Sequence, residues 1–238
     1  MQSPNRDFIH VRSERATATT ATFMSKVYLW MVAGIFISGL TAFYVAATPT
    51  LITAMIQNKG MFIGLLIAQF AAVIALSAAV QYMSVLVAAA VYIFYAVLVG
   101  ATFSTLFLVY SMASLSLAFF TTSFAFVGLS AIGFLTKRDL GPVGSFCTIG
   151  LFGAIGLIIV GFFVPSMMTN AMQLTISAMC IIIFAGLTAY DTQKIKALQY
   201  QFANDDDASK GAIHGALILY LDFINLFLNI LRFMGNRR

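Results

Sequence analysis

The sequence predicts an all-α membrane protein with seven transmembrane helices, the last of them central and enclosed by the other six. Hydrophobic residues make up 61% of the 238 residues and charged residues only 9%, and the mean hydropathy is +0.96. Because soluble domains carry about 25% charged residues, this composition excludes a soluble globular protein. A hydrocarbon core about 30 Å thick needs about 20 apolar residues per helix, so one membrane domain of six or seven spans fits this length.

Charged and polar residues divide the chain into these spans. No charged residue occurs from Gly60 to Thr136 or from Leu140 to Tyr190, and the polar breaks QYMS, YSMAS and PSMMTN interrupt the apolar stretches. Pro142, in the charged loop TKRDLGP, suits the first turn of the next helix. The sixth span is expected to continue past the membrane surface through Lys194 and Lys196. The expected spans are Val27–Ala47, Met61–Val80, Ser84–Val109, Ala113–Leu135, Val143–Val164, Ala171–Tyr190 and Ala212–Leu231.

The first 26 residues are expected to be a disordered cytoplasmic tail, followed by a transmembrane domain over residues 27–238. The tail mixes charges and threonines without an apolar core, so it is not a signal peptide. Lysines and arginines favour the cytoplasmic side of a membrane. With the N-terminus inside, nine bases are cytoplasmic and four lie outside, which predicts this orientation. The nine are Arg6, Arg12, Arg15, Lys26, Lys137, Arg138, Lys194, Lys196 and Lys210, and the four are Lys59, Arg232, Arg237 and Arg238.

Two acidic residues, Asp191 and Asp222, fall within or at the edge of spans. An aspartate at the centre of a span costs about 2.5–3.5 kcal/mol on insertion scales, so such residues face protein or water and are functional by default. On the last helix, a polar stripe is expected on one face. The stripe comprises Asp222, Asn225, Asn229 and Arg232 at 3-4-3 spacing, with His214 eight residues before Asp222. On the sixth helix, Asp191 shares a face with Thr188, Ser177 and Gln173.

Facing stripes would bring the two carboxyl groups together. Two carboxylates in a low-dielectric site cannot both ionise cheaply, so the pair would share a proton and respond to pH near neutrality. The pair would also form an all-oxygen site that attracts Ca²⁺, which makes Asp191 and Asp222 the candidate metal ligands. Two structural alternatives remain open. Asp222 could form a polar knot with Asn225 and Asn229, and Lys194 or Lys196 could neutralise Asp191.

Other features indicate no further site. Cys147 and Cys180 lie in apolar stretches without metal-ligand spacing and are expected to be buried thiols. The acidic run NDDDAS at residues 204–209 lacks the ligand pattern of a calcium-binding loop and is expected to be a solvated loop. The net charge of +5 follows membrane topology, so no nucleic-acid partner is expected. The lipid bilayer is the expected partner, and no cofactor is expected apart from Ca²⁺ as a transported ion.

Three segments of the sequence resemble the Bax inhibitor-1 (transmembrane Bax-inhibitor-motif) family, and most closely its bacterial inner-membrane members. They are FAGLTAYDTQKIK (Phe184–Lys196), GALILYLDFINLFLNILRFMGNRR (Gly215–Arg238) and GFLTKRDL (Gly133–Leu140). The resemblance implies a seven-helix fold with an enclosed last helix and a pH-dependent Ca²⁺ leak governed by an aspartate pair at Asp191 and Asp222. Some relatives pair this dyad with a base on the second span. Nothing between Lys59 and Lys137 is charged here, which argues against a gate that exchanges a salt bridge for a shared proton.

Three functions compete at this point. The first is a proton-regulated cation leak. The second is a non-catalytic modulator of membrane proteases or stress responses, whose partner would be a membrane protease or another membrane protein. The third is an intramembrane aspartyl protease, suggested by two membrane aspartates and the tyrosine before Asp191. Its second aspartate would need a Gly-x-Gly-Asp context, whereas Asp222 lies in LYLD, so an enzyme is not expected.

Overall fold

The structure is a computed structural model that describes residues 4–202 and 204–235, with side chains from Thr20 onward except that of Gln201. The described residues form helices and no strand. Seven helices are long and apolar enough to cross a membrane, which confirms the predicted fold class. The elements are α1 (Pro4–Ala47), α2 (Pro49–Gln57), α3 (Lys59–Ala79), η1 (Val80–Tyr82), α4 (Val85–Phe103), α5 (Leu106–Val109), α6 (Met112–Leu135), α7 (Gly141–Phe163), η2 (Pro165–Met167), α8 (Asn170–Leu198), η3 (Gln199–Gln201) and α9 (Asp205–Met234).

The polar breaks predicted from the sequence contain the residues that begin the helices. Ser84, Ser111 and Thr169 cap α4, α6 and α8, because each side chain accepts a hydrogen bond from a backbone N–H in the first turn. Pro142 lies in the first turn of α7, where its missing N–H costs nothing. The short helix α2, which starts at Pro49, was not predicted as a separate element.

The last helix is longer than predicted, because α9 begins at Asp205 and not at Ala212. Asn204 caps it by accepting a hydrogen bond from the Asp207 N–H at 2.8 Å. The run Asp205–Asp207 therefore occupies the first helical turn, where carboxylates interact favourably with the helix dipole. The prediction that this run forms a loop was wrong, because the run is helical. Consecutive acidic residues are compatible with a solvated loop and also with the first turn of a helix.

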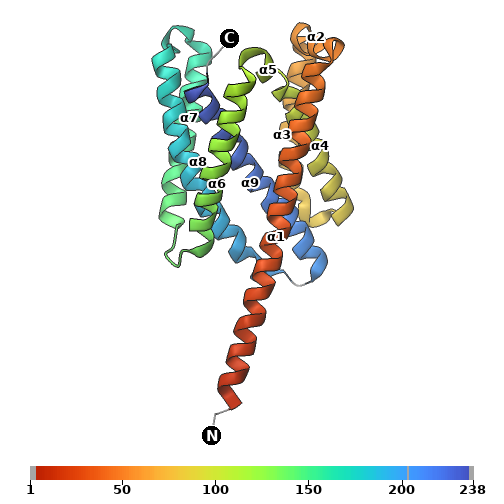
Figure 1. Ribbon diagram of the computed structural model, residues 1–238, viewed down its shortest axis with the longest axis vertical. Helices are drawn as coiled ribbons and strands as arrows, with labels where there is room; N and C mark the ends of the chain where they lie inside the picture. The colour runs from red at the N-terminus through yellow and green to blue at the C-terminus, as the bar shows by residue number, and fades with distance from the viewer. Residues whose placement is uncertain (1–3, 203, 236–238) are drawn as a thin grey trace.

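The first helix also starts earlier than predicted, at Pro4 and not at Val27. It projects from the bundle at its N-terminal end (Figure 1), through the segment predicted to be a disordered tail. Side-chain packing begins no later than Thr20, and Phe23 and Met24 are 5% and 2% exposed. The packed domain therefore extends at least seven residues before the predicted boundary at residue 27, since an apolar face on this part of α1 contacts the bundle.

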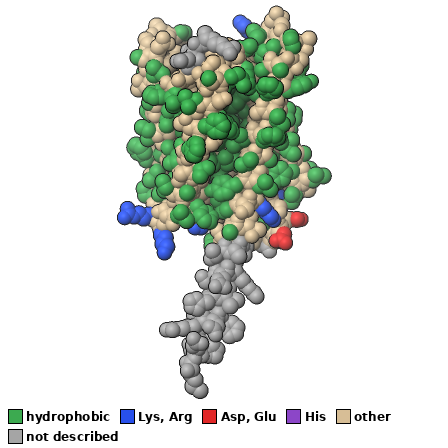
Figure 2. All heavy atoms as spheres, viewed as in Figure 1, with side chains coloured by type: hydrophobic (Ala, Val, Ile, Leu, Met, Phe, Trp, Pro, Cys, Tyr) green, Lys and Arg blue, Asp and Glu red, His purple; other side chains and the backbone are tan. Residues whose placement is uncertain are grey.

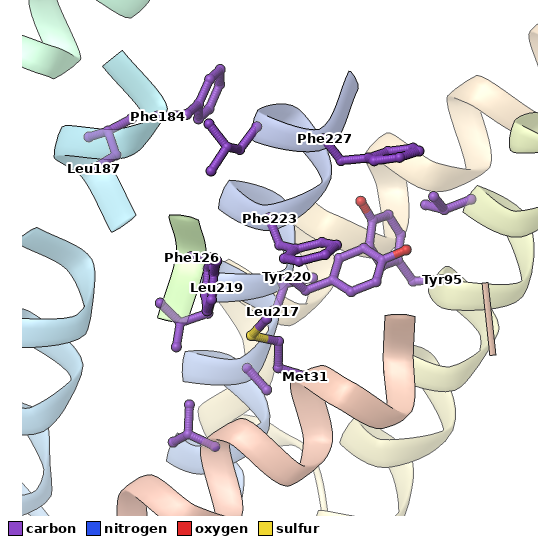
Figure 3. Packing of buried hydrophobic residues seen from close by; sticks show 14 of the residues in the cluster. Met31, Tyr95, Phe126, Phe184, Leu187, Leu217, Leu219, Tyr220, Phe223 and Phe227 are labelled. Carbon is purple, nitrogen blue, oxygen red and sulfur yellow. The ribbon is translucent and has the colours of Figure 1, made fainter. Parts of the chain in front are cut away.

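The last helix is the most buried of the seven and crosses the bundle obliquely (Figure 1). It packs against α8, α1, α6, α4 and α3, whereas α7 packs mainly against α8. Enclosure by all six other spans is thus not what the structure shows, because α8 lies between α7 and α9. Figure 3 shows the core built around α9, with Tyr220 and Phe223 among residues from α1, α4, α6 and α8.

The outer surface has the distribution of a membrane protein. Hydrophobic side chains cover the flank of the bundle, and basic side chains gather mainly at the end from which α1 projects (Figure 2). Large apolar residues such as Phe124, Phe146 and Phe162 are more than 70% exposed on this flank. Since water would disfavour such exposure, the flank is a surface for lipid.

Candidate functional site

Asp191 of α8 and Asp222 of α9 lie at the crossing of these two helices, which pack closely along their length. Asp222 is only 5% exposed, and Asp191 is half-buried. The two carboxyl groups are close enough to interact with each other electrostatically. A hydrogen bond between two carboxyl groups requires a proton on one of them, so this arrangement suits a pair that carries one proton.

Among the side chains that the structure describes, no cation is in direct contact with the pair. Among the described residues the one ion pair joins Lys210 and Asp207, with Nζ and Oδ1 2.9 Å apart. The Lys194 charge is close enough to interact with Asp191, but its ammonium group lies 5.8 Å from the centre of the Tyr190 ring. Lys196 is held elsewhere, because its Nζ donates to the Phe134 carbonyl oxygen at 2.7 Å. In addition, Asp222 Oδ2 has no hydrogen-bond partner among the described residues.

A cluster of hydroxyl groups surrounds Thr192, the residue that follows Asp191 in α8. Thr192, next to Asp191, donates to the Thr188 carbonyl oxygen at 2.7 Å and lies 3.3 Å from the Ser130 hydroxyl. Tyr28 of α1 contacts both Ser130 and Thr192. Thr188 itself, a predicted member of the site, is fully buried and donates to the Phe184 carbonyl oxygen. The sequence analysis missed Tyr28, Ser130 and Thr192, since single hydroxyl residues in apolar spans are common and give only a weak signal.

The asparagines of the predicted stripe are not bonded to Asp222. The Asn225 amide donates to the Leu221 carbonyl oxygen, and the Asn229 amide donates to the Asn225 carbonyl oxygen, each at 2.8 Å. These bonds lie within α9 itself, so the polar knot around Asp222 is not observed. Arg232 is exposed at the far end of α9.

His214 lies against a different helix from the one that Asp222 meets. Its Nδ1 is 3.2 Å from the Leu76 carbonyl oxygen of α3. Because α9 crosses the bundle obliquely, one face of this helix meets α3 near its start and α8 further along (Figure 1). On α8, Ser177 donates to the Gln173 carbonyl oxygen and makes no described hydrogen bond to the pair. In the described part of the chain, no hydrogen bond joins His214, Asn225 or Asn229 to a stripe residue of α8.

A close approach of α6 and α8 fixes the position of the Asp191 turn. Gly133 of α6 lies directly against the backbone carbonyl of Ala189, where a side chain would collide. The loop that follows α6 is clamped by Gln193, which accepts from the Leu140 N–H and donates to the Arg138 carbonyl oxygen, each at 2.9 Å. The turn of α8 that carries Asp191 is thereby held on both sides.

The oxygen donors suit a passing cation better than a resident one. Ca²⁺ takes six to eight oxygen ligands, whereas two carboxyl groups supply at most four. Within residues 20–200, 202 and 204–235, no group of three or more His, Cys, Asp or Glu side chains could hold a metal ion. Hydroxyl and carbonyl oxygens near Thr188 and Thr192 could add ligands only transiently, since helix hydrogen bonds already use them.

Comparison with known proteins identifies the family. The family model described as inhibitor of apoptosis-promoting Bax1 matches residues 20–238. The chain is 40% identical to the inner membrane protein YbhL of Escherichia coli over 219 residues, which cover 91% of this chain and 92% of that protein. It is 37% identical over 97% of its length to an uncharacterized protein of Deinococcus radiodurans and 36% identical over 91% to one of Borreliella burgdorferi, covering 96% and 92% of those chains. The chain therefore belongs to the Bax inhibitor-1 family, as an integral, multi-pass protein of the inner membrane.

Proposed function

We propose that the protein is a non-enzymatic, pH-sensitive cation leak in the inner membrane, gated by the proton that Asp191 and Asp222 share. The observation that carries this proposal is the contact between two carboxyl groups at the α8–α9 crossing without a cation in direct contact. A membrane protein retains such a pair against its cost of insertion, which points to a role in function.

The proposed gate follows from the charge of the pair. With one proton, the two carboxyl groups bond to each other and hold α8 against α9. When that proton leaves, two like charges remain in contact in a medium of low dielectric constant, where repulsion is strong. The helices then separate and the doubly negative pair attracts a cation. The leak is therefore expected to increase as the pH rises through the titration of the pair.

The cation that fits the proposal best is Ca²⁺, because carboxylate oxygens are its preferred ligands. Na⁺ and protons are the competing ions, since two carboxylates alone do not select among hard cations. Flux measurements with each ion in turn separate these possibilities.

The decisive experiment measures Ca²⁺ flux through proteoliposomes of the purified protein between pH 5 and pH 8. Asp191→Asn and Asp222→Asn replace a carboxyl group by an amide of the same shape, which cannot gain a second negative charge. Each variant should lose most of the pH dependence and stay at the low flux of the protonated pair. Asp139→Asn makes the same change in the exposed loop before α7 and should keep the wild-type profile.

Two results would contradict the proposal. A pH profile that stays unchanged in both variants removes the pair from the gate. Absence of flux in the wild-type protein at every pH, for Ca²⁺, Na⁺ and protons alike, removes the leak itself. Cleavage of a membrane peptide by the same proteoliposomes, lost in Asp222→Asn, would support the aspartyl protease instead.

A second candidate function, modulation of a membrane protease or another membrane protein, is favoured by α1. Its N-terminal part projects beyond the bundle as a helix (Figure 1), where a partner could bind it. Deletion of residues 1–19 should then leave ion flux intact and change the turnover rate of membrane proteins in cells. An unchanged turnover rate in deleted and wild-type strains would count against this candidate.

A further inference from the structure

An apolar groove runs along the bundle between α1 and α6, with α9 as its floor. Its first half has a volume of about 550 Å³ and is lined by α1 from Tyr28 to Ile35 and by α6 from Phe119 to Leu135. Its second half, of about 330 Å³, continues along α1 to Ala42. The halves share Ile35, Phe119 and Phe223, so they form one groove. Figure 1 shows α9 behind the space between α1 and α6.

The groove is long enough for one lipid chain. The stretch of α1 from Tyr28 to Ala42 comprises 15 residues, and the 14 steps between its ends rise about 21 Å at 1.5 Å per residue. One leaflet of a bilayer contributes about 15 Å of hydrocarbon, half of the total of about 30 Å. The groove therefore accommodates an acyl chain along its full extent in one leaflet.

The walls favour an apolar occupant over water or another helix. In the first half of the groove, Ser123 donates to the Phe119 carbonyl oxygen at 2.8 Å and Ser130 lies 3.3 Å from the Thr192 hydroxyl, so both serines already have partners. Ordered water needs two to four polar partners, which this mainly apolar half does not favour. Helices that pack in lipid favour small residues at their contacts. The first half of this groove presents mainly bulky residues, such as Phe119, Phe126 and Phe223.

Positive charge lies at the mouth of the groove, at the end from which α1 projects. The Lys196 ammonium group is 4.6 Å from the ring centre of Phe134, which lines the groove. Lys137 and Arg138 are exposed in the loop after Leu135. Among the described side chains none of these three bases forms an ion pair with a carboxylate. A phosphate at the level of the head groups would complement them, since basic residues near a membrane attract anionic lipids.

We propose that the groove between α1 and α6 binds one anionic glycerophospholipid, with an acyl chain along α9 and its phosphate beside Lys196. This site goes beyond the proposed leak and does not depend on it. The lipid would touch Phe223, the neighbour of Asp222, and Tyr28, which contacts Thr192 beside Asp191.

The test uses tryptophan fluorescence and lipids that carry bromine on an acyl chain. Trp30 is the single tryptophan, so a Trp30→Phe variant without native tryptophan fluorescence serves as the background. Val127→Trp then reports on the groove, and Ile149→Trp reports on ordinary surface lipid at a similar depth on α7. Val127 and Ile149 are 67% and 73% exposed, so neither substitution enters the core. Vesicles contain increasing fractions of brominated phosphatidylglycerol or brominated phosphatidylcholine.

Phosphatidylglycerol should quench Val127→Trp at about a fivefold lower fraction than phosphatidylcholine, the preference expected for one basic residue near an anionic lipid. Ile149→Trp should show no preference. Lys196→Gln should remove the preference at the groove, and Lys196→Arg should restore it. If Lys196→Gln does not fold, the double variant Lys137→Gln/Arg138→Gln, at two exposed positions, should lower the preference for phosphatidylglycerol at the groove instead.

Two outcomes would overturn the proposal. Equal quenching by both lipids at Val127→Trp would mean that the groove holds unselected surface lipid. Weaker quenching of Val127→Trp than of Ile149→Trp by both lipids would mean that a protein segment covers the groove.

Discussion

Asp222 is placed where a carboxyl group is energetically costly. It is 5% exposed, touches a second carboxyl group and leaves one oxygen without a described partner. A buried polar group left unpaired costs about 1–3 kcal/mol, and two like charges in contact add to that. A residue that costs this much without stabilising the fold is expected to serve the gate.

Asp222→Asn should therefore stabilise the protein. The amide removes the like charge, so the free energy of unfolding in detergent at pH 8 should rise by about 1–3 kcal/mol. The gain should shrink at pH 5, where a proton already neutralises the pair in the wild-type protein. Thermal melts followed by circular dichroism measure both values. Asp139→Asn is the control and should lower stability slightly, because Asp139 Oδ1 accepts the Gly141 N–H at 2.8 Å. A destabilised Asp222→Asn at pH 8 would argue for a structural role.

At the residue scale the sequence singled out Asp191 and Asp222 but not the hydrogen-bond partners of the residues around them. Two isolated acids on polar helix faces predicted that Asp191 and Asp222 approach each other, and their role as a pair stays a prediction. The partners of Asn225 and Asn229 were not predictable in this way, because a buried amide in an apolar span takes the nearest free acceptor, here a carbonyl of its own helix. The contact of His214 with Leu76 was not predictable, because helical periodicity gives a face but not the neighbour that this face meets.

Among the elements, the contact between α6 and α8 positions the Asp191 turn. Gly133→Ala should push these helices apart, since the added methyl group would meet the Ala189 carbonyl and the Thr192 side chain. Overpacking of this kind costs about 1–3 kcal/mol. Gly128→Ala on the same helix is the matched control, because no atom lies within 4 Å of the added group. It should be neutral or stabilise the helix by up to about 1 kcal/mol.

The pH dependence of flux separates a local effect from a general one. Gly133→Ala should alter this dependence along with stability, because it moves the backbone next to Asp191, whereas Gly128→Ala should leave it unchanged. Equal effects of the two substitutions would show that the α6–α8 contact has no special influence on the pair.

Hydropathy predicted the helix boundaries well within the membrane but not outside it. The starts and ends of the middle spans were close to those predicted, because apolar length and capping residues both mark them. The first turns of α9 and the N-terminal part of α1 are polar, so hydropathy could not assign them. Asn204 followed by three acids was the available signal for the start of α9, since it matches a capped helix N-terminus.

At the scale of the whole molecule, charge is asymmetric between the two ends. The described bases Lys26, Lys137, Arg138, Lys194, Lys196 and Lys210 belong to the end from which α1 projects, and Lys59 and Arg232 belong to the other. Figure 2 shows this gathering of basic side chains at one end. The sequence predicted the grouping because an odd number of spans alternates the loops between two sides, and a full crossing by α9 places the chain ends on opposite sides (Figure 1).

This asymmetry predicts that the N-terminus and the start of α9 face the cytoplasm. Asp206→Cys should react with a membrane-impermeant thiol reagent only in inverted vesicles, and Lys59→Cys only in intact spheroplasts. Both positions are exposed, whereas the native Cys147 and Cys180 are 3% and 5% exposed and should contribute little background. Labelling of Asp206→Cys in spheroplasts would reverse the orientation. The basic mouth of the α1–α6 groove would then lie in the outer leaflet. The end of α8 that follows Asp191 would lie on the same side of the membrane.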